Sequence, residues 1–389
     1  MARFSPRFIK TIRHLAIIGF ISLAGLTAGS WFYIHQLSAS QQVPVKNMKA
    51  TLAQSLSHDI TLHFLGVKKI IVKKETIQQW VEPYHRSYSG QDDVRLSDRL
   101  SDYLQKISTT VGTEPQDTRF IIENGKVRII APSREGTRLD IALADAIIRQ
   151  ALLANLSDVT IPLDKTAPAI TEEKIFSLGI NQKLASGQSN FTGSSPARIQ
   201  NISVASALYN GLLIPAGQTF SFNTILGEVD AEHGYAPEKV IKSNKIEYEY
   251  GGGICQVSTT VFRAAIAAGF PIVERKPHAF PVVYYSPQGF DATIYPGVSD
   301  LRFINDTGSY VLVQIKLFGK NLYVDMYGTS DGRSVAVTTP EQYDVQPDGS
   351  MKAFFTRTIS RADGTVKEER FNSSYKSPSL YPTQPNPYQ

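Results

Sequence analysis

The chain has 389 residues, of which 42% are hydrophobic and 10% aromatic, a size and composition that suit two or three globular domains. Its 40 Lys and Arg residues exceed the 35 Asp and Glu residues, for a formal net charge of +5. Six of the basic residues fall within the first 50 positions, which leaves 34 against the 35 acidic residues. The remainder is therefore close to neutral, so nothing in the charge supports nucleic acid as a partner.

The N-terminus carries a long apolar run. Four basic residues precede Leu15–Ile34, and no Asp or Glu occurs before Asp59. A run of about 20 apolar residues spans a bilayer, and a basic flank marks its cytoplasmic side. We predict a cytoplasmic tail at 1–13, an uncleaved single-pass anchor in the cell membrane at 14–36 and a stalk at 37–58, with the C-terminal part extracytoplasmic. The alternative is a cleaved secretory signal, although apolar regions of signals are shorter, about 7–15 residues.

The segment 59–168 mixes strand and helix patterns. The predicted elements are a strand at 60–64, a helix at 96–111, a hairpin at 120–130, a helix at 139–152 and a strand at 159–163. The hairpin prediction depends on the turn dipeptide Asn124-Gly125. We interpret 59–168 as a small mixed α/β module, followed by a Pro-containing linker.

The next domain is predicted at 169–330. Ser, Gly and Asn dominate 186–195, which predicts a surface loop. Ser195 then caps a helix that begins at Pro196. Taken with the module before it, this pattern predicts an α+β fold class.

Strand patterns dominate the C-terminal part. We predict a β-rich module at 331–372, in which Asp363-Gly364 is a strong hairpin signal. The segment 373–389 is rich in Pro, Ser and Tyr, which predicts a disordered tail.

The only cysteine of the chain, Cys255, follows Gly251-Gly252-Gly253 and precedes a helical pattern. Glycines permit a sharp turn, and the N-terminus of a helix favours a thiolate over a thiol. A single cysteine excludes an intrachain disulfide and a Cys-rich metal site. A free cysteine is often only a small buried hydrophobe. However, an unpaired thiol outside the cytoplasm is unusual, so we interpret Cys255 as a nucleophile.

A cysteine nucleophile needs a base, a group that orients the base, and an oxyanion hole. We predict His278 as the base, in preference to His233, and Asp291 as the orienting group. Asp300, Glu274 and Arg275 are alternatives for the orienting role. The backbone N–H groups around Cys255 and Gln256 are natural oxyanion donors.

Seven further residues are expected to bind substrate: Gly251, Gly252, Gly253, Gln256, Ser258, Thr259 and Arg275. The glycines and Gln256 would shape an acyl pocket, and the Arg275 guanidinium suits a peptide carboxylate. Ser258 and Thr259 have helix capping as an alternative role.

Several motifs, in the same order, resemble the VanW family. They are Asn210–Asn223, Gly234-Tyr235, Gly251–Thr260, Glu274-Arg275 with His278, and Asp291-Ala292-Thr293. The resemblance covers roughly residues 197–317. The 59–168 module, through Gly136-x-x-Leu139-Asp140, resembles the peptidoglycan-binding module that precedes many bacterial VanW domains.

The VanW family is named for a gene of glycopeptide-resistance clusters, and some cell-wall members are linked to L,D-transpeptidation through the motif cysteine. The resemblance implies a bacterial cell-wall protein whose partners are peptidoglycan stem peptides and whose nucleophile is Cys255. No Ser-x-Gly-Cys-Arg run, typical of established L,D-transpeptidases, is present.

These observations predict cysteine-dependent, L,D-transpeptidase-like acyl transfer on stem peptides, with no cofactor and no metal. The alternative is a non-catalytic peptidoglycan-binding or scaffolding protein. A metal-dependent hydrolase is disfavoured, because no histidine pair stands at ligand spacing.

Overall fold

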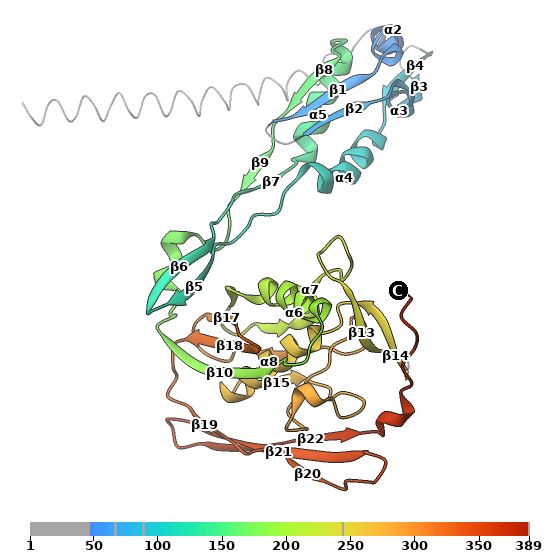
Figure 1. The fold of residues 1–389 in the computed structure, drawn as a ribbon. Coiled ribbons are helices and arrows are strands. Elements are labelled where there is room, and N and C mark those ends of the chain that lie inside the picture. Colours follow the sequence, from blue (N-terminus) through green and yellow to red (C-terminus); the bar gives the residue numbers. More distant parts are fainter. Residues whose placement is uncertain (1–46, 66–67, 88–89, 243–244, 388–389) are drawn as a thin grey trace, which may run out of the picture. The chain divides into compact units, whose positions relative to one another are not determined.

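The computed structural model describes residues 47–65, 68–87, 90–242 and 245–387, which form two compact units with separate cores (Figure 1). The first unit comprises the described residues up to Thr113 together with Thr137–Lys165, and the second comprises Glu114–Gly136 and the described residues from Thr166 onward. Both units mix helices with strands, which agrees with the predicted α+β class.

The predicted tail 1–13, the predicted anchor 14–36 and the first part of the predicted stalk, 37–46, lie outside the described residues. The last part of the stalk contains a short helix, α2, at Met48–Ala53. Among the helices that the structure describes, none is long and apolar enough to cross a membrane.

The first unit contains three-stranded and two-stranded sheets with two longer helices. Its elements, with β7 and β9 at its boundary, are α2, β1 (Ile60–Phe64), β2 (Lys68–Val72), α3 (Lys74–Gln79), β3 (Val81–Arg86), β4 (Gln91–Leu96), α4 (Arg99–Val111), β7 (Gly136–Arg138), α5 (Ile141–Leu153), β8 (Asp158–Ile161) and β9 (Asp164–Thr166). Strand β1 lies between antiparallel β2 and parallel β8. The predicted helical spacing is confirmed by α4, because Leu100, Leu104 and Val111 are fully buried.

The predicted hairpin is present as β5 (Arg119–Glu123) and β6 (Lys126–Ala131), but it belongs to the second unit. Phe120 is fully buried in a cluster with Ile170 and Leu312. The Ile122 N–H donates to Gln314 Oε1 at 2.7 Å, and Gln314 Nε2 donates back to Ile122 O at 3.0 Å. These contacts explain why the segment 59–168 is not one compact body.

The other elements of the second unit are built around helix α8. They are β10 (Gln182–Asn190), α6 (Pro196–Tyr209), β11 (Leu212–Ile214), β12 (Thr219–Ser221), α7 (Phe222–Leu226), β13 (Pro237–Lys242), β14 (Lys245–Tyr250), α8 (Ile254–Ala267), β15 (Ile272–Glu274), β16 (Arg302–Ile304), β17 (Val311–Phe318), β18 (Asn321–Gly328), β19 (Ser334–Val337), β20 (Glu341–Tyr343), β21 (Met351–Ser360) and β22 (Val366–Tyr375). The main sheet has the order β10-β18-β17-β11, and α8 packs against β10 and β18 (Figure 1).

Strand β10 includes 186–190, the first half of the surface loop that the sequence predicted at 186–195. Its small residues permit a close approach to α8: a Cβ atom on Gly187 would lie 2.3 Å from the Thr260 carbonyl oxygen. Ser189 is buried, and its hydroxyl bonds to the Thr260 hydroxyl at 2.7 Å. Gly187 and Ser189 are therefore small because this face of the strand packs tightly on a helix, whereas the opposite face is exposed.

The predicted disordered tail at 373–389 is wrong for most of its length. Strand β22 continues to Tyr375, which is 2% exposed, and Tyr381 is 5% exposed. Further along, the Gln384 N–H donates to the Ile246 carbonyl at 2.7 Å. The tail was misread because Ser and Pro lower its hydrophobicity, although Tyr375 and Tyr381 are buried in the second unit.

Candidate active site

Cys255 is the second residue of α8, separated from the three glycines by Ile254. Gly251 and Gly253 have φ values of 90° and 116°, which only glycine adopts readily. First-turn N–H groups lack a partner within their helix. Among the described residues, the Cys255 N–H has no hydrogen-bond acceptor, so it remains available to a ligand.

The Cys255 thiol is partly buried and surrounded by polar groups. Its Sγ lies 3.6 Å from Thr293 Oγ1 and 3.6 Å from the Ile294 carbonyl oxygen. Burial raises the pKa of the thiol, but the hydrogen bond and the charge of His278 outweigh burial, so the pKa of Cys255 is lowered. The site therefore favours a thiolate.

His278 is buried beside the thiol, with 4% of its surface exposed. Its Nδ1 lies 2.5 Å from Asp291 Oδ2, and its backbone N–H donates to the same oxygen at 2.8 Å. With Nδ1 engaged by Asp291, Nε2 is the nitrogen left for the thiol. The Tyr285 ring stacks on the imidazole, with ring centres 4.5 Å apart.

The His278 imidazole favours its charged form. Burial lowers its pKa, but the bonds to Asp291 and Cys255 outweigh burial and raise the pKa of His278 to about 9. The lowered pKa of Cys255 and the raised pKa of His278 both shift the pair toward thiolate and imidazolium.

Asp291 is 1% exposed and is held by three residues from two parts of the chain, His278 and Arg275 in one and Tyr375 in the other. Tyr375 on β22 donates its hydroxyl to Asp291 Oδ1 at 2.5 Å, and Arg275 Nη2 donates to the same oxygen at 3.2 Å. Burial raises the pKa of Asp291, but the hydrogen bond and the charge of His278, with Arg275 and Tyr375, hold it well below its usual range. Asp291 is therefore a fixed, ionised partner of the imidazole.

Arg275, predicted to bind a substrate carboxylate, directs its guanidinium at the protein. Its five hydrogen bonds reach the Asp291 carbonyl and carboxylate, the Gly289 and Asn372 carbonyls and the Ser373 hydroxyl. A guanidinium has five N–H donors, so this set leaves none for a ligand. In this geometry Arg275 supports Asp291.

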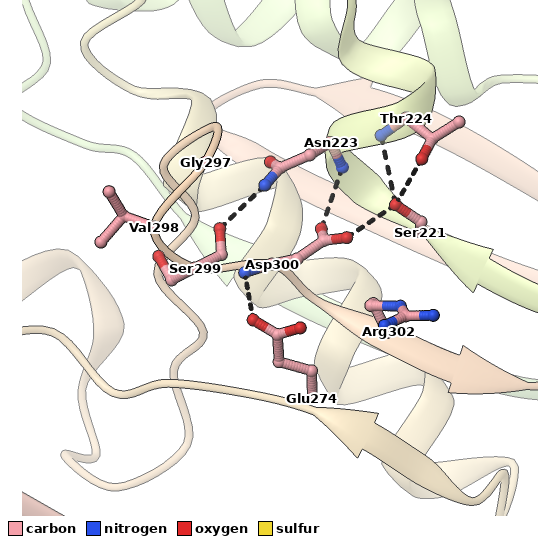
Figure 2. A pocket seen from close by; sticks show the side chains of 9 residues that line it. All are labelled: Ser221, Asn223, Thr224, Glu274, Gly297, Val298, Ser299, Asp300 and Arg302. Carbon is pink, nitrogen blue, oxygen red and sulfur yellow. Dashed lines mark hydrogen bonds between the residues drawn. The ribbon is translucent and has the colours of Figure 1, made fainter.

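Two alternative orienting groups, Asp300 and Glu274, lie elsewhere, in a polar pocket of about 460 Å³ (Figure 2). Asp300 Oδ2 accepts from the Ser221 hydroxyl at 2.6 Å, Oδ1 accepts from the Asn223 N–H at 2.9 Å, and the Asp300 N–H donates to Glu274 Oε1 at 2.8 Å. The pocket lining includes none of Cys255, His278 and Asp291.

His233, the alternative base, lies on the surface, and its Nδ1 is 2.7 Å from Asp230 Oδ1. In the described parts of the chain, no three His, Cys, Asp or Glu side chains gather as they would around a metal ion.

The side chains expected to bind substrate are buried next to the thiol. Gln256, Ser258 and Thr259 are fully buried. Gln256 Nε2 donates to the Asn190 carbonyl at 2.8 Å, whereas the Ser258 and Thr259 hydroxyls donate to the Ala292 carbonyl. The Gln256 bond joins α8 to β10, and the Ser258 and Thr259 bonds join α8 to the segment that carries Asp291.

The glycines have packing roles as well. A Cβ atom on Gly252 would lie 2.6 Å from the Lys239 carbonyl oxygen, and one on Gly251 would lie 2.5 Å from Val229 Cγ1. The glycine run therefore lets β13 approach the start of α8.

Three residues near the site were missed by the sequence reasoning. Tyr375 lies in the segment predicted to be disordered, Tyr285 was given no role, and Arg198 was counted only as part of a helix. A buried charge such as Arg198 has no signature in a single sequence, because neither its burial nor its partners are visible there.

Comparisons with known families agree with the two motif regions. The family model "VanW like protein" matches residues 197–327. A model of a peptidoglycan-binding domain matches residues 93–160. The two matches support a role related to the cell wall, and the second supports peptidoglycan as a partner.

Two relatives have similar sequences. Uncharacterized protein YoaR of Bacillus subtilis (strain 168) is 30% identical over 234 residues, which is 60% of this chain and 75% of the relative. Vancomycin B-type resistance protein VanW of Enterococcus faecalis (strain ATCC 700802 / V583) is 33% identical over 117 residues, covering 28% of this chain and 42% of the relative.

Two solved structures were also found. A cysteine-to-serine mutant of Enterococcus faecium L,D-transpeptidase is 16% identical, with 32% of this chain and 47% of that chain covered. The Ldtfm–avibactam carbamoyl enzyme is 12% identical, with 52% and 73% covered. Both have a TM-score of 0.22, which is too low to carry an argument about the reaction. The sequence relatives and the family models carry the assignment, and by them the chain belongs to the VanW family.

Proposed function

We propose that this protein is a cysteine acyltransferase, L,D-transpeptidase-like, that acts on the stem peptides of peptidoglycan. The observation that carries the proposal is the arrangement of Cys255 at the start of α8 with the buried pair His278 and Asp291. The peptidoglycan-binding domain match at 93–160 supports the choice of substrate.

In the first step of the proposed reaction, the Cys255 thiolate attacks the carbonyl carbon of a stem-peptide amide. The Cys255 N–H, in the first turn of α8, is the proposed donor to the developing oxyanion. His278, which carries the thiol proton, passes it to the departing amine. The products are a thioester on Cys255 and the released amine.

In the second step, an amine of a neighbouring stem peptide attacks the thioester. His278 takes a proton from this amine, a new amide bond forms, and the proton returns to the Cys255 sulfur. Asp291 keeps the imidazole in one orientation through both steps, because it accepts from Nδ1 throughout. If water replaces the amine, the same site hydrolyses the thioester.

The experiment is a search for the thioester on the wild-type chain. Intact-protein mass spectrometry after incubation with tetrapeptide stems should show one acyl group on Cys255, and Cys255→Ser should abolish turnover while it keeps the fold. Turnover that survives Cys255→Ser refutes the mechanism. Absence of adduct and turnover, with peptidoglycan still bound, would favour the second candidate, a non-catalytic peptidoglycan-binding protein.

A further inference from the structure

Arg198 on α6 is a buried arginine without a carboxylate partner in the described part of the chain. It is 9% exposed. The contrast is Arg357, which is fully buried and bonds to the Glu369 carboxylate and to two backbone carbonyls. The Arg198 Nη1 donates to the Ser194 hydroxyl at 2.8 Å, a neutral acceptor. A buried charge that lacks an ionic partner is costly unless a ligand provides one.

Arg198 lies beside the candidate nucleophile. A Cβ atom on Gly253, two residues before Cys255, would lie 2.9 Å from Arg198 Cγ. The guanidinium carbon lies 3.9 Å from the centre of the Tyr284 ring. The next residue, Tyr285, interacts with Arg198 through its hydroxyl and stacks on His278.

We propose that Arg198 binds a carboxylate of the ligand at this site, and that the preferred ligand is a peptide that ends in a free carboxylate close to the attacked amide. The guanidinium fork matches a carboxylate in two parallel hydrogen bonds, and its position over Tyr284 fixes the plane of that fork. The role that the sequence suggested for Arg275 thus belongs to Arg198, because the Arg275 donors are all used.

The chemistry of the proposed reaction fits this assignment. When a thiolate attacks the amide that precedes a terminal amino acid, the leaving amine carries that residue's carboxylate. A residue of extended chain spans at most about 3.6 Å, so this carboxylate stays near the start of α8. Peptides that continue beyond that residue, or whose terminal carboxyl is an amide, lose the ionic bond. This assignment rests on the proposed function for the identity of the peptide.

The test measures binding without turnover. Calorimetry on the full chain carrying Cys255→Ser compares a tetrapeptide stem with a free C-terminal carboxylate and the same peptide as its C-terminal amide. We expect the acid to bind about tenfold more tightly or better. Adding Arg198→Met keeps an unbranched side chain against Gly253. It should weaken binding of the acid peptide by about that factor and leave binding of the amide peptide unchanged.

The matched control is Arg370→Met on β22. Arg370 also stacks on an aromatic ring, with its guanidinium carbon 3.5 Å from the centre of Phe354, but it is exposed. This change should keep the preference for the acid. Arg198→Lys provides a second variant, should Arg198→Met lower the melting temperature sharply. A lysine keeps the charge without the fork, so it should retain part of the preference.

The outcomes separate this proposal from the acyltransferase proposal. Equal binding of acid and amide to the parent, an unchanged preference in Arg198→Met, or no binding of either peptide overturns the role of Arg198. If a thioester forms on wild-type Cys255 but the acid and the amide bind equally, the acyltransferase proposal is supported and the role of Arg198 is refuted. If the preference for the carboxylate depends on Arg198 but no thioester forms, the binding site is supported and the acyltransferase proposal is refuted.

Discussion

At the scale of single residues, the thiol and the imidazole set each other's protonation. Cys255 is the only thiol, so a reagent that counts thiols reports on this site alone. Alkylation by iodoacetamide requires the thiolate. Because His278 lowers the Cys255 pKa, wild-type labelling should persist below the pH at which an ordinary thiol loses reactivity, and it should fall as pH drops through the lowered pKa.

His278→Ala removes the group that lowers the thiol pKa and leaves burial, which raises it. The midpoint of the labelling curve should therefore move to higher pH, measured by intact-protein mass spectrometry from pH 5 upward. His233→Ala is the control, because His233 pairs with Asp230, and its curve should coincide with the wild type. Identical curves for His278→Ala and the wild type would contradict the interaction.

The same pair predicts an alkaline limit for acyl transfer. His278 must hold a proton for the leaving amine, and its pKa is raised to about 9. The rate should fall as pH rises through about 9, since the imidazolium is then lost while the thiolate remains. A rate that stays level to pH 10 or above contradicts the role of His278 as proton donor.

Tyr375 is a positioning residue for Asp291. Tyr375→Phe removes the hydroxyl that donates to Asp291 at 2.5 Å and accepts from the Gly289 N–H at 2.7 Å. Buried groups left without partners cost about 1–3 kcal/mol, so urea unfolding should show a loss of that size. Tyr343→Phe, at an exposed tyrosine of β20, should stay within about 0.5 kcal/mol of the wild type.

A stability loss alone would not identify positioning. The labelling curve of Tyr375→Phe should also shift, since Asp291 then holds the imidazole less firmly. An unshifted curve would reduce Tyr375 to a packing role.

At the scale of elements, the approach of β10 to α8 depends on one glycine. A Cβ atom on Gly187 would lie 2.3 Å from the Thr260 carbonyl oxygen and 2.6 Å from the Ala264 nitrogen, and backbone atoms cannot rotate away. Gly187→Ala should therefore lower the free energy of unfolding by at least about 2–3 kcal/mol. Gly217→Ala is the control: its φ is 73° and no atom lies within 4 Å, so only the backbone cost of about 1–2 kcal/mol applies. Equal losses in the two variants, by urea unfolding, contradict the clash.

Helices were more predictable than strands in this chain. The periodicity of buried residues gave α4, α5, α6 and α8 within a few residues, because one helical face carries a repeating signal. In contrast, Val283–Tyr285 has strand-forming residues but forms a short helical turn, in which Tyr285 stacks on His278. Strand propensity depends on neighbours, and those neighbours are distant in the sequence.

At the scale of the whole chain, the candidate site needs the C-terminal strand. A chain that ends at Asn372 lacks Tyr375 and Tyr381. It should unfold at a lower temperature, and the pH midpoint of its thiol labelling should differ from that of the wild type. A chain that ends at Asn386 keeps both tyrosines and the Gln384–Ile246 bond, and it should match the wild type. Thermal unfolding of both chains checks this, and a stable chain ending at Asn372 with normal labelling would contradict it.

The N-terminal segment carries a separate prediction. We propose that 14–36 remains as a single-pass membrane anchor, with the C-terminal units extracytoplasmic, because the apolar run is long and basic residues flank it. Mass spectrometry of the protein from its native membrane should find residues 1–40 intact. An N-terminus near residue 30 or 40 would instead indicate a cleaved signal.

The sequence located the candidate site better than it explained it. Cys255 could be singled out as the only thiol, and His278 and Asp291 from their order in the motifs. The structure brings these three together. The support of Asp291 by Tyr375 could not be predicted, since a hydroxyl from a distant strand leaves no local pattern. For the same reason Arg275 looked like a ligand-binding residue when its donors face the protein.

The dependence of Asp291 on Tyr375 also sets an order in time. A ribosome makes Cys255 long before Tyr375. A growing chain therefore passes through a stage in which the thiol is present but Asp291 lacks the hydrogen bond from Tyr375. During that stage the thiol should react as an ordinary one, and acyl groups should not be captured. Competence then arrives late in synthesis, as the last long strand joins the sheet, so only a chain completed through that strand would gain the reactive sulfur.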